Sequence, residues 1–441
     1  ESPAAKEALL ETLERGTLLL NYIGHGNETT LTAEEVFQVE DIRDWPAQER
    51  LALWVTATCE FGRHDSPFIR SAAEELMIIP DKGAIGLLTT GRPVFSSVNF
   101  RLNEAFVQEV FKRDNGESRT LGEIFKNTKN QSLNGALNRN FALLGDPSMK
   151  LASPELEIEI SSLKSVSKQT EVDTLSAFQE IELKGQVIDP LSGAKLSSFD
   201  GEYLIDIRDK PGTSTTLGDE SNPFDFKEEK VSLFRGKGKI SAGEFTSTFL
   251  ISSNIDYEYG KGALRILGTE EDGVSEAFGG RTPIIGGSGE KPNDKEGPQI
   301  QAYFNEKSEN LSFNSKQIIL DLTLEDISGI NVSGLNPGQN IEVQVNNNPP
   351  QNLNSLFLSS DGNFTKGSLT TTINNLNEGL NKITIRAWDN VGNSSSLERI
   401  IEVVGSNFIQ ILSHKVYPNP SSIESNFEIS HNRPDENLVL S

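Results

Sequence analysis

Two short stretches decide the expected fold: Leu18-Leu19-Leu20-Asn21-Tyr22-Ile23-Gly24-His25-Gly26 and Leu51-Ala52-Leu53-Trp54-Val55-Thr56-Ala57-Thr58-Cys59-Glu60-Phe61-Gly62. Each is an apolar run that favours a β-strand, ends near glycine and carries a reactive side chain at its carboxyl end. Open α/β sheets place their chemistry at the carboxyl ends of the strands. We therefore expect His25 and Cys59 to lie at one edge of a shared sheet.

The first 151 residues alternate between helical and strand patterns. Thr32, with Glu35 three positions on, predicts a capping box that starts a helix ending before Pro46. The other expected helices cover 2–15, 71–77 and about 98–112, and the expected strands cover 17–23, 51–58 and 83–90. In the helix at 98–112, one apolar face is expected to hold Phe100, Leu102, Phe106, Val107, Val110 and Phe111. This alternation predicts a mostly parallel sheet covered on both faces, in an α/β domain over residues 1–151.

The pattern changes near residue 152, where helical periodicity gives way to short alternating runs separated by turn residues. We expect a β-sandwich at 152–285 and an immunoglobulin-like β-sandwich at 298–404, ending in a hairpin with strands at 382–388 and 397–404. Residues 279–298 are rich in Gly, Pro and charge and predict a linker or a long loop. Residues 405–441 are expected to begin a further β-domain that the end of the chain truncates. The predicted fold class is thus multidomain, α/β followed by all-β.

Composition limits the possible functions. The chain has 441 residues, with 40 Lys and Arg against 64 Asp and Glu, so its formal net charge is −24. Such a chain would be repelled by phosphate, which argues against nucleic-acid binding. No signal peptide is visible, and the helical pattern at the start indicates a fragment of a longer precursor. The single cysteine excludes an internal disulfide, as in cytosolic proteins and some secreted bacterial proteins.

His25 and Cys59 together suggest nucleophilic catalysis. A nearby imidazole favours the thiolate of a cysteine and supplies the proton that a leaving amine needs. Gly24 and Gly26 leave room for a peptide, and the backbone N–H groups of Gly26 and Cys59 could stabilise an oxyanion. Alone, the cysteine is more often a small buried apolar residue, and the histidine a turn residue. The pair at two strand ends favours the catalytic interpretation.

Other polar residues nearby have alternative roles. Glu28, Glu60 and Asp65 could orient His25, although each also fits a solvated loop carboxylate. His64 is a rival base, but it lies five positions beyond Cys59 in a polar loop. No set of residues has calcium-loop spacing, and Glu270-Glu271-Asp272-Gly273 is typical of a solvated turn. No metal ligand and no cofactor are assigned.

Several motifs resemble the gingipain family of caspase-like cysteine proteases over residues 1–151: Gly24-His25-Gly26, Thr58-Cys59-Glu60-Phe61-Gly62 with Asp65, Ser71–Leu76, Gly83-Ala84-Ile85-Gly86, Thr89-Thr90-Gly91-Arg92 and Leu143-Leu144-Gly145-Asp146-Pro147-Ser148. Downstream motifs resemble the β-domains of type IX secretion sortases, among them Val187-Ile188-Asp189, Phe199-Asp200-Gly201, Leu233-Phe234-Arg235-Gly236 and Tyr417-Pro418-Asn419-Pro420. The resemblance extends over nearly the whole chain, and it implies that residues 405–441 are a truncated C-terminal sorting-type β-domain.

This resemblance implies a secreted peptidase on the bacterial cell surface, associated with the outer membrane. It would remove the C-terminal sorting domain from type IX secretion cargo and transfer the product to anionic lipopolysaccharide or to water. His25 would be the acid/base, Cys59 the nucleophile, and the amides of Gly26 and Cys59 the oxyanion hole. The implied partners are the outer-membrane barrel PorV and the attachment-complex proteins PorQ and PorZ. Structural calcium is known in gingipain relatives, without ligands that can be assigned here.

The same family comparison places the carboxylate that orients the histidine well upstream of Gly-His-Gly. Only 24 residues precede His25 in this sequence, so that carboxylate is expected before residue 1. Two other functions fit the sequence: a surface adhesin or scaffold with an inert caspase-like domain, and a secreted protease that digests rather than sorts.

Overall fold

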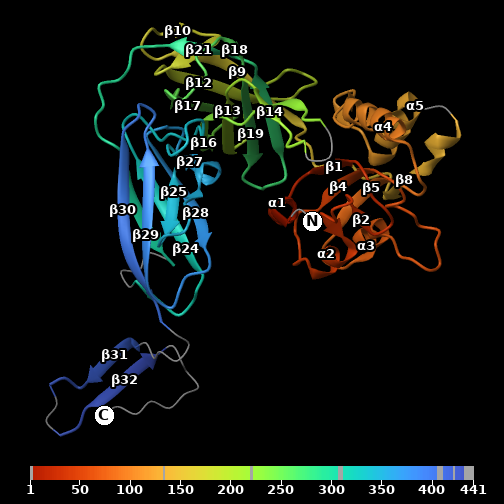
Figure 1. The fold of residues 1–441 in the computed structure, drawn as a ribbon. Helices are drawn as coiled ribbons and strands as arrows, with labels where there is room; N and C mark the ends of the chain where they lie inside the picture. Colours follow the sequence, from red (N-terminus) through yellow and green to blue (C-terminus); the bar gives the residue numbers. More distant parts are fainter. Residues whose placement is uncertain are drawn as a thin grey trace. The chain divides into compact units, whose positions relative to one another are not determined.

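The computed structural model describes residues 3–132, 135–218, 222–305, 311–404, 411–420 and 423–431 (Figure 1). The chain divides into two compact units. Unit 1 holds residues 1–155 with a short piece at 190–192, and unit 2 holds the remainder. The structure is mostly β, with helices concentrated in unit 1. The predicted class, α/β followed by all-β, is confirmed.

Unit 1 is built on a four-stranded sheet in the order β1-β4-β5-β8. Its strands are β1 (Leu19–Ile23), β4 (Ala52–Ala57), β5 (Ala84–Thr90) and β8 (Phe141–Gly145). The first three run parallel and β8 is antiparallel to β5. Alternate residues of β4 enter two different clusters, Trp54 on one face and Leu53 and Val55 on the other, and all three are fully buried. Both faces of the sheet are therefore covered, as the continuous apolar run predicts.

Short elements surround this sheet. The helices are α1 (Pro3–Arg15), α2 (Val39–Asp44), α3 (Ala72–Ile78), α4 (Ser96–Glu109), α5 (Leu121–Ser132) and the 3₁₀ helix η1 (Ala136–Asn140). Two small hairpins complete unit 1: β2 (Thr30–Leu31) with β3 (Phe37–Gln38), and β6 (Arg113–Asp114) with β7 (Glu117–Ser118).

The helix predicted to start at Thr32 is wrong. Thr32 and Glu35 both have left-handed backbone conformations, with φ of 66° and 57°. The N–H of Thr32 donates to the carbonyl of His25 at 2.9 Å, so this segment pairs with the histidine segment instead of coiling. The helix begins later, at a capping box formed by Gln38 and Asp41.

The apolar face predicted for the helix at 98–112 is partly wrong. The buried stripe of α4 contains Val98, Leu102 and Phe106, spaced four residues apart. Phe100, Val107 and Phe111 point away from that stripe and are 56–62% exposed. Residues four positions apart share one face of a helix. Phe100 lies two positions from both Val98 and Leu102, so its side chain lies on another face.

Unit 2 contains a large sheet in the order β17-β12-β9-β20-β19-β13-β16-β27-β28-β24-β22, with β10 paired to β9. In that order the strands are Glu244–Leu250, Glu180–Ile188, Leu156–Ser165, Glu276–Arg281, Ala263–Glu270, Gly201–Arg208, Ser232–Ile240, Leu358–Ser359, Lys366–Ile373, Ile318–Glu325 and Gln299–Phe304, and β10 is Thr170–Glu171.

A five-stranded sheet of unit 2 has the order β23-β30-β29-β25-β26. Its strands are Ser312–Phe313, Ser394–Val403, Gly379–Trp388, Glu342–Val345 and Gln351–Asn352, with the 3₁₀ helix η2 (Asn354–Leu356) nearby in sequence. β29 and β30 pair antiparallel, so the hairpin expected at the end of this module is confirmed.

The remaining strands of unit 2 form smaller sheets: β11 (Thr174–Ala177) with β21 (Ile284–Ser288) and β18 (Gly260–Lys261), β14 (Gly212–Thr215) with β15 (Asp225–Glu228), and β31 (Ile411–Tyr417) with β32 (Asn426–His431). Part of the predicted linker at 279–298 is therefore strand β21, which is hydrogen-bonded on both edges. Because strand hydrogen bonds hold this Gly-rich segment on both edges, it is part of a sheet rather than a linker.

Unit 2 has two hydrophobic cores, one from residues between Ile158 and Ile285 and one from residues between Phe304 and Val403. The large sheet is continuous across both, because β16 pairs with β27 at Gly236 and Ser359. Phe364, from the second segment, packs into the first core. The domain boundaries expected at 285, 298 and 404 stay predictions.

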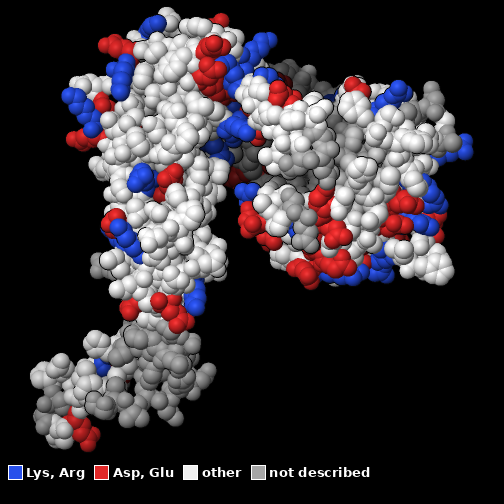
Figure 2. All heavy atoms as spheres, viewed as in Figure 1, with Lys and Arg blue, Asp and Glu red and all other residues white. Residues whose placement is uncertain are grey.

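Among the residues that the structure describes, no helix is long and apolar enough to cross a membrane. On the face shown in Figure 2, Lys and Arg side chains lie interspersed with Asp and Glu side chains.

Candidate active site

The strand register brings His25 and Cys59 to equivalent positions. β1 and β4 pair in parallel, with Ile23 opposite Ala57, and the Gly24 N–H extends the ladder to the Ala57 carbonyl at 3.4 Å. His25 lies two residues after Ile23, and Cys59 lies two residues after Ala57. We call residues 24–29 the His25 loop and residues 58–71 the Cys59 loop.

His25 is exposed and Cys59 is partly buried. The Sγ of Cys59 lies 3.6 Å from the carbonyl oxygen of Val94, within reach of a weak S–H···O contact. No hydrogen bond joins the imidazole to the thiol among the described residues. The assignment of these two side chains as a catalytic pair stays a prediction.

The backbone of His25 is held from two sides. Its carbonyl accepts hydrogen bonds from the Thr32 N–H at 2.9 Å and from the Tyr22 hydroxyl at 2.5 Å. Burial raises the pKa of Tyr22, so the phenol stays protonated and remains a donor. A Cβ on Gly24 would lie 2.5 Å from the Tyr22 hydroxyl oxygen, so this arrangement requires glycine at position 24.

The Cys59 loop turns sharply after the thiol. Glu60 has a left-handed φ of 54°, and the N–H of Gly62 donates to the Thr90 carbonyl at 2.8 Å. The Thr90 hydroxyl donates to the carbonyl of Thr58, beside Cys59. The end of β5 therefore fixes both sides of the turn that carries the thiol.

The two loops touch next to the reactive residues. A Cβ on Gly26 would lie 2.6 Å from the Thr58 hydroxyl oxygen and 2.9 Å from the Thr30 carbonyl oxygen. Gly26 and Leu31 form an isolated antiparallel bridge whose hydrogen bonds come from the flanking residues. In the described part of the chain, the N–H groups of Gly26 and Cys59 have no acceptor, as oxyanion donors require. Their predicted role as an oxyanion hole stays a prediction.

The three carboxylates considered as orienting groups bind arginine instead. Glu28 and Glu60 lie 3.0 and 3.6 Å from the Nη1 of Arg63. The Arg92 guanidinium lowers the pKa of Asp65 to about 2. Within the described ranges, none of the three forms a hydrogen bond with His25.

His64, the rival base, contacts its own loop. Its Nδ1 lies 2.9 Å from the Gly62 carbonyl oxygen, and its ring lines a cavity of about 440 Å³ with Met77 and Leu144. No hydrogen bond to Cys59 is found for it among the described residues. Nothing in its contacts favours it over His25.

One group of side chains could hold a metal ion, judged from the described residues. Asp294, Asp326 and Asp389, in unit 2, have carboxylate oxygens within 4.8 Å of one another. The sequence analysis missed them because they are 32 and 63 positions apart, outside any calcium-loop spacing. The pKa of Asp326 is raised to about 7, mainly by burial. The Ser328 N–H, which donates to this carboxylate, opposes the rise, and the neighbouring Asp389 and Asp294 add to it.

Replacing Asp326 with asparagine is expected to flatten the pH dependence of stability. A folded-state pKa near 7, against an ordinary 3.8, means that the folded protein binds this proton more tightly. Wild-type stability should therefore fall as the pH rises from about 4 to about 7, by about 2–4 kcal/mol. Urea unfolding followed by circular dichroism at pH 4, 6 and 8 measures this. The variant should have the same free energy of unfolding as the wild type at pH 4 and a higher one at pH 8. If the free energy of unfolding depended on pH equally in the two proteins, the prediction would be contradicted.

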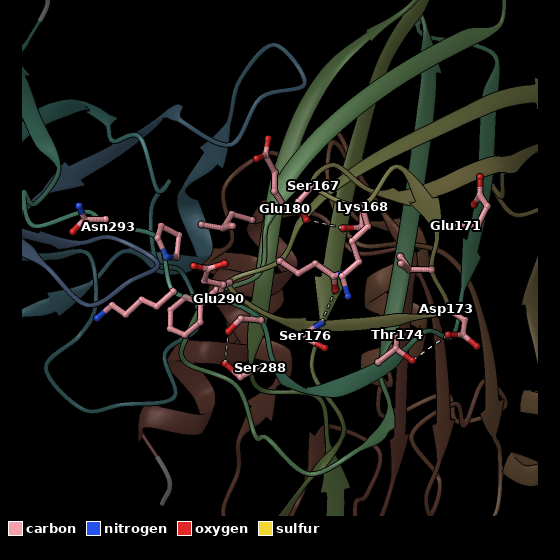
Figure 3. A pocket seen from close by; sticks show the side chains of 18 residues that line it. Ser167, Lys168, Glu171, Asp173, Thr174, Ser176, Glu180, Ser288, Glu290 and Asn293 are labelled. Atoms are coloured by element: carbon pink, nitrogen blue, oxygen red, sulfur yellow. Dashed lines mark hydrogen bonds between the residues drawn. The ribbon is translucent and has the colours of Figure 1, made fainter.

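A cavity of about 790 Å³ lies in unit 2 and does not include the reactive pair (Figure 3). Some of its polar side chains bind one another or the backbone: Thr174 donates to Asp173 at 3.1 Å, and Gln179 accepts from the Ser176 N–H at 3.1 Å. It carries none of the chemistry predicted from the sequence.

Unit 1 thus combines a covered α/β sheet with a thiol and an imidazole that follow the ends of neighbouring strands. Residues 1–152 match the model of Peptidase family C25. This segment is therefore similar to the gingipain-type cysteine peptidases, as the sequence motifs predicted.

A comparison with curated protein sequences finds no match. Among solved structures, the chain is similar to dimeric latent PorU from Porphyromonas gingivalis, with 21% identity and a TM-score of 0.38. The match covers 74% of this chain and 32% of the PorU chain, so the sequence spans about a third of that protein.

Two further similarities involve individual parts of the architecture. The complex of Porphyromonas gingivalis RgpB pro- and mature domains shows 12% identity and a TM-score of 0.32, covering 64% of this chain and 56% of that one. Fibronectin(III)-like modules of Clostridium thermocellum CbhA show 12% identity and a TM-score of 0.16, and the match covers 58% of this chain and 97% of that one.

Proposed function

We propose that this protein is a sortase-type peptidase in which Cys59 is the nucleophile and His25 the general acid and base. The main support is the parallel register of β1 and β4, which carries both residues to the same edge of the sheet two positions past the last paired residues. The match of residues 1–152 to a cysteine peptidase family points the same way.

The proposed reaction has two steps. The Cys59 thiolate attacks the scissile carbonyl carbon, and the oxyanion that forms accepts hydrogen bonds from the N–H groups of Gly26 and Cys59. His25 then protonates the leaving amine, and a thioester remains on Cys59. Water or a second amine attacks the thioester after giving a proton to His25. Water yields hydrolysis, and an amine yields a new amide bond.

The substrates we propose are secreted proteins that carry a C-terminal sorting domain, and the acceptor is water or an amine on anionic lipopolysaccharide. The protein would act at the outer-membrane surface with PorV, PorQ and PorZ. These proposals follow from sequence motifs spread over both units. β-Rich modules such as those of unit 2 are suited to bind protein partners.

Alkylation of Cys59 tests the catalytic assignment. Cys59 is the only cysteine, so iodoacetamide labelling reports on it alone. We expect fast labelling of the folded protein at pH 6–7, and slower labelling after His25→Ala. Labelling that requires denaturation would contradict the assignment and would favour an adhesin or scaffold with an inert peptidase domain.

Cargo processing tests the sorting function. Cells that carry Cys59→Ala should retain C-terminal domains on many unrelated secreted proteins. Normal cargo combined with a loss of bulk proteolysis would instead show a digestive protease. Restoration by wild-type protein controls for indirect effects.

A further inference from the structure

A salt bridge joins the two loops that carry the proposed catalytic residues. The Nη1 of Arg63, in the Cys59 loop, lies 3.0 Å from Oε1 of Glu28, in the His25 loop. The two side chains are 36% and 22% exposed. A partly covered pair is less screened by water and salt than an exposed one, so it can restrain geometry.

Glu28 is the nearest of three carboxylates around this guanidinium. Glu60 lies 3.6 Å from Arg63 Nη1, and Asp65 lies 3.7 Å from its Nε. Asp65 already forms a bidentate ion pair with Arg92. The contact of Arg63 with Glu28, by contrast, has hydrogen-bond geometry. The strongest contact of Arg63 therefore reaches across to the other loop.

The backbone of both loops is anchored at the start of α3. The N–H of Ala72 donates to the Glu28 carbonyl at 2.8 Å, and the N–H of Ala73 donates to the Phe61 carbonyl at 3.3 Å. Above these anchors the loops touch at Gly26 and Thr58. Glu28 is thus held at its backbone and its carboxylate is directed to the Cys59 loop.

We propose that Arg63 is a positioning residue, which holds the His25 loop against the Cys59 loop through Glu28 and so sets the alignment of imidazole and thiol. This inference rests on the proposed function. Arg63 does not contact substrate in this role. It acts through the placement of His25, three residues before Glu28 in the chain.

The expected effect is a loss of turnover with little loss of substrate binding. Arg63→Gln should lower kcat by about 10- to 100-fold, as expected for a misalignment near 1 Å, and change KM by less than about twofold. Glu28→Gln should give the same loss, and the double variant should be no worse than either single variant. Arg63→Lys should recover part of kcat, because an ammonium can reach Glu28 without the planar geometry of a guanidinium.

The sign of the change separates positioning from electrostatics. Arg63→Gln removes a positive charge near the thiol, whereas Glu28→Gln removes a negative one. A purely electrostatic role would shift the pH profile of Cys59 alkylation in opposite directions in the two variants. Positioning predicts slower alkylation at pH 6–7 in both. The other charged groups facing these loops, Glu60, Asp65 and Arg92, are unchanged in both variants.

Arg43→Gln is the matched control. Arg43 pairs with Glu75 at 3.1 Å, belongs to α2 rather than to either loop, and leaves Glu75 its second partner, Arg70. Its kcat and alkylation rate should stay within about twofold of the wild type. Thermal unfolding of all variants verifies that each is folded.

Two negative outcomes are distinguishable. If His25→Ala does not slow alkylation of the otherwise unchanged protein, the proposed function fails. If His25→Ala slows it but Arg63→Gln and Glu28→Gln leave rate and kcat unchanged, or move them in opposite directions, the positioning role alone is overturned.

Discussion

Replacing Cys59 with serine is expected to lower kcat/KM for a peptide substrate by at least about 10³-fold. A serine hydroxyl is a far weaker nucleophile than a thiolate when its only activating group is an imidazole suited to a thiol. Hydrolysis of a fluorogenic peptide by the purified protein measures the loss. A variant that keeps a tenth or more of the wild-type rate would exclude Cys59 as the nucleophile.

The same substitution should hardly affect folding. The thiol is partly exposed, and among the described residues its one polar contact is the weak interaction with the Val94 carbonyl at 3.6 Å. The free energy of unfolding should change by less than about 0.5 kcal/mol. Equal urea midpoints for the two proteins would show that the lost activity comes from lost chemistry rather than from unfolding.

Replacing Gly26 with alanine is expected to reduce kcat by about 100-fold. The added methyl group would lie 2.6 Å from the Thr58 hydroxyl oxygen and 2.9 Å from the Thr30 carbonyl oxygen. Because one of these atoms belongs to the backbone, the His25 loop must move to relieve the clash. Displacing an acid/base group by about 1 Å is costly for catalysis. Steady-state kinetics gives kcat, and we expect the unfolding free energy to fall by about 1–3 kcal/mol.

Gly91→Ala is the matched control for this prediction. Its Cβ would meet its nearest neighbours at 3.8 and 3.9 Å, which is ordinary van der Waals contact. We expect wild-type stability and only a small change in kcat. Similar losses for the two alanine variants would show that the close packing of Gly26 has no special role.

The sequence predicted the elements that create the sheet edge. The continuous apolar runs at β4 and β5 favoured strands buried on both faces, and the parallel pairing of β1 with β4 carries His25 and Cys59 to equivalent positions after the two strands. Gly24 and Gly26 were predicted to leave room for a peptide, which stays a prediction; the structure adds that a Cβ at either position would meet Tyr22 or Thr58. The local sequence pattern is sufficient to predict a strand where nearly all of its residues are apolar, as in β4.

Other features depend on contacts between distant residues and could not be predicted. Thr32 fits a helix cap by local sequence, but its N–H is drawn into a bond with the His25 carbonyl. The Arg63–Glu28 pair and the cluster of Asp294, Asp326 and Asp389 each join segments more than 30 residues apart. A single sequence shows which residues carry charge, but tertiary pairing decides which charges meet.

The pairing of Gly236 with Ser359 means that unit 2 should resist dissection. A fragment ending near residue 290 would leave the outer edge of β16 with bare N–H and C=O groups, and it would lack Phe364 from its interior. Unsatisfied strand edges recruit other chains, so such a truncated protein would be prone to aggregate. In the intact protein each core therefore depends on residues of the other segment, so we expect the two to unfold together rather than one after the other.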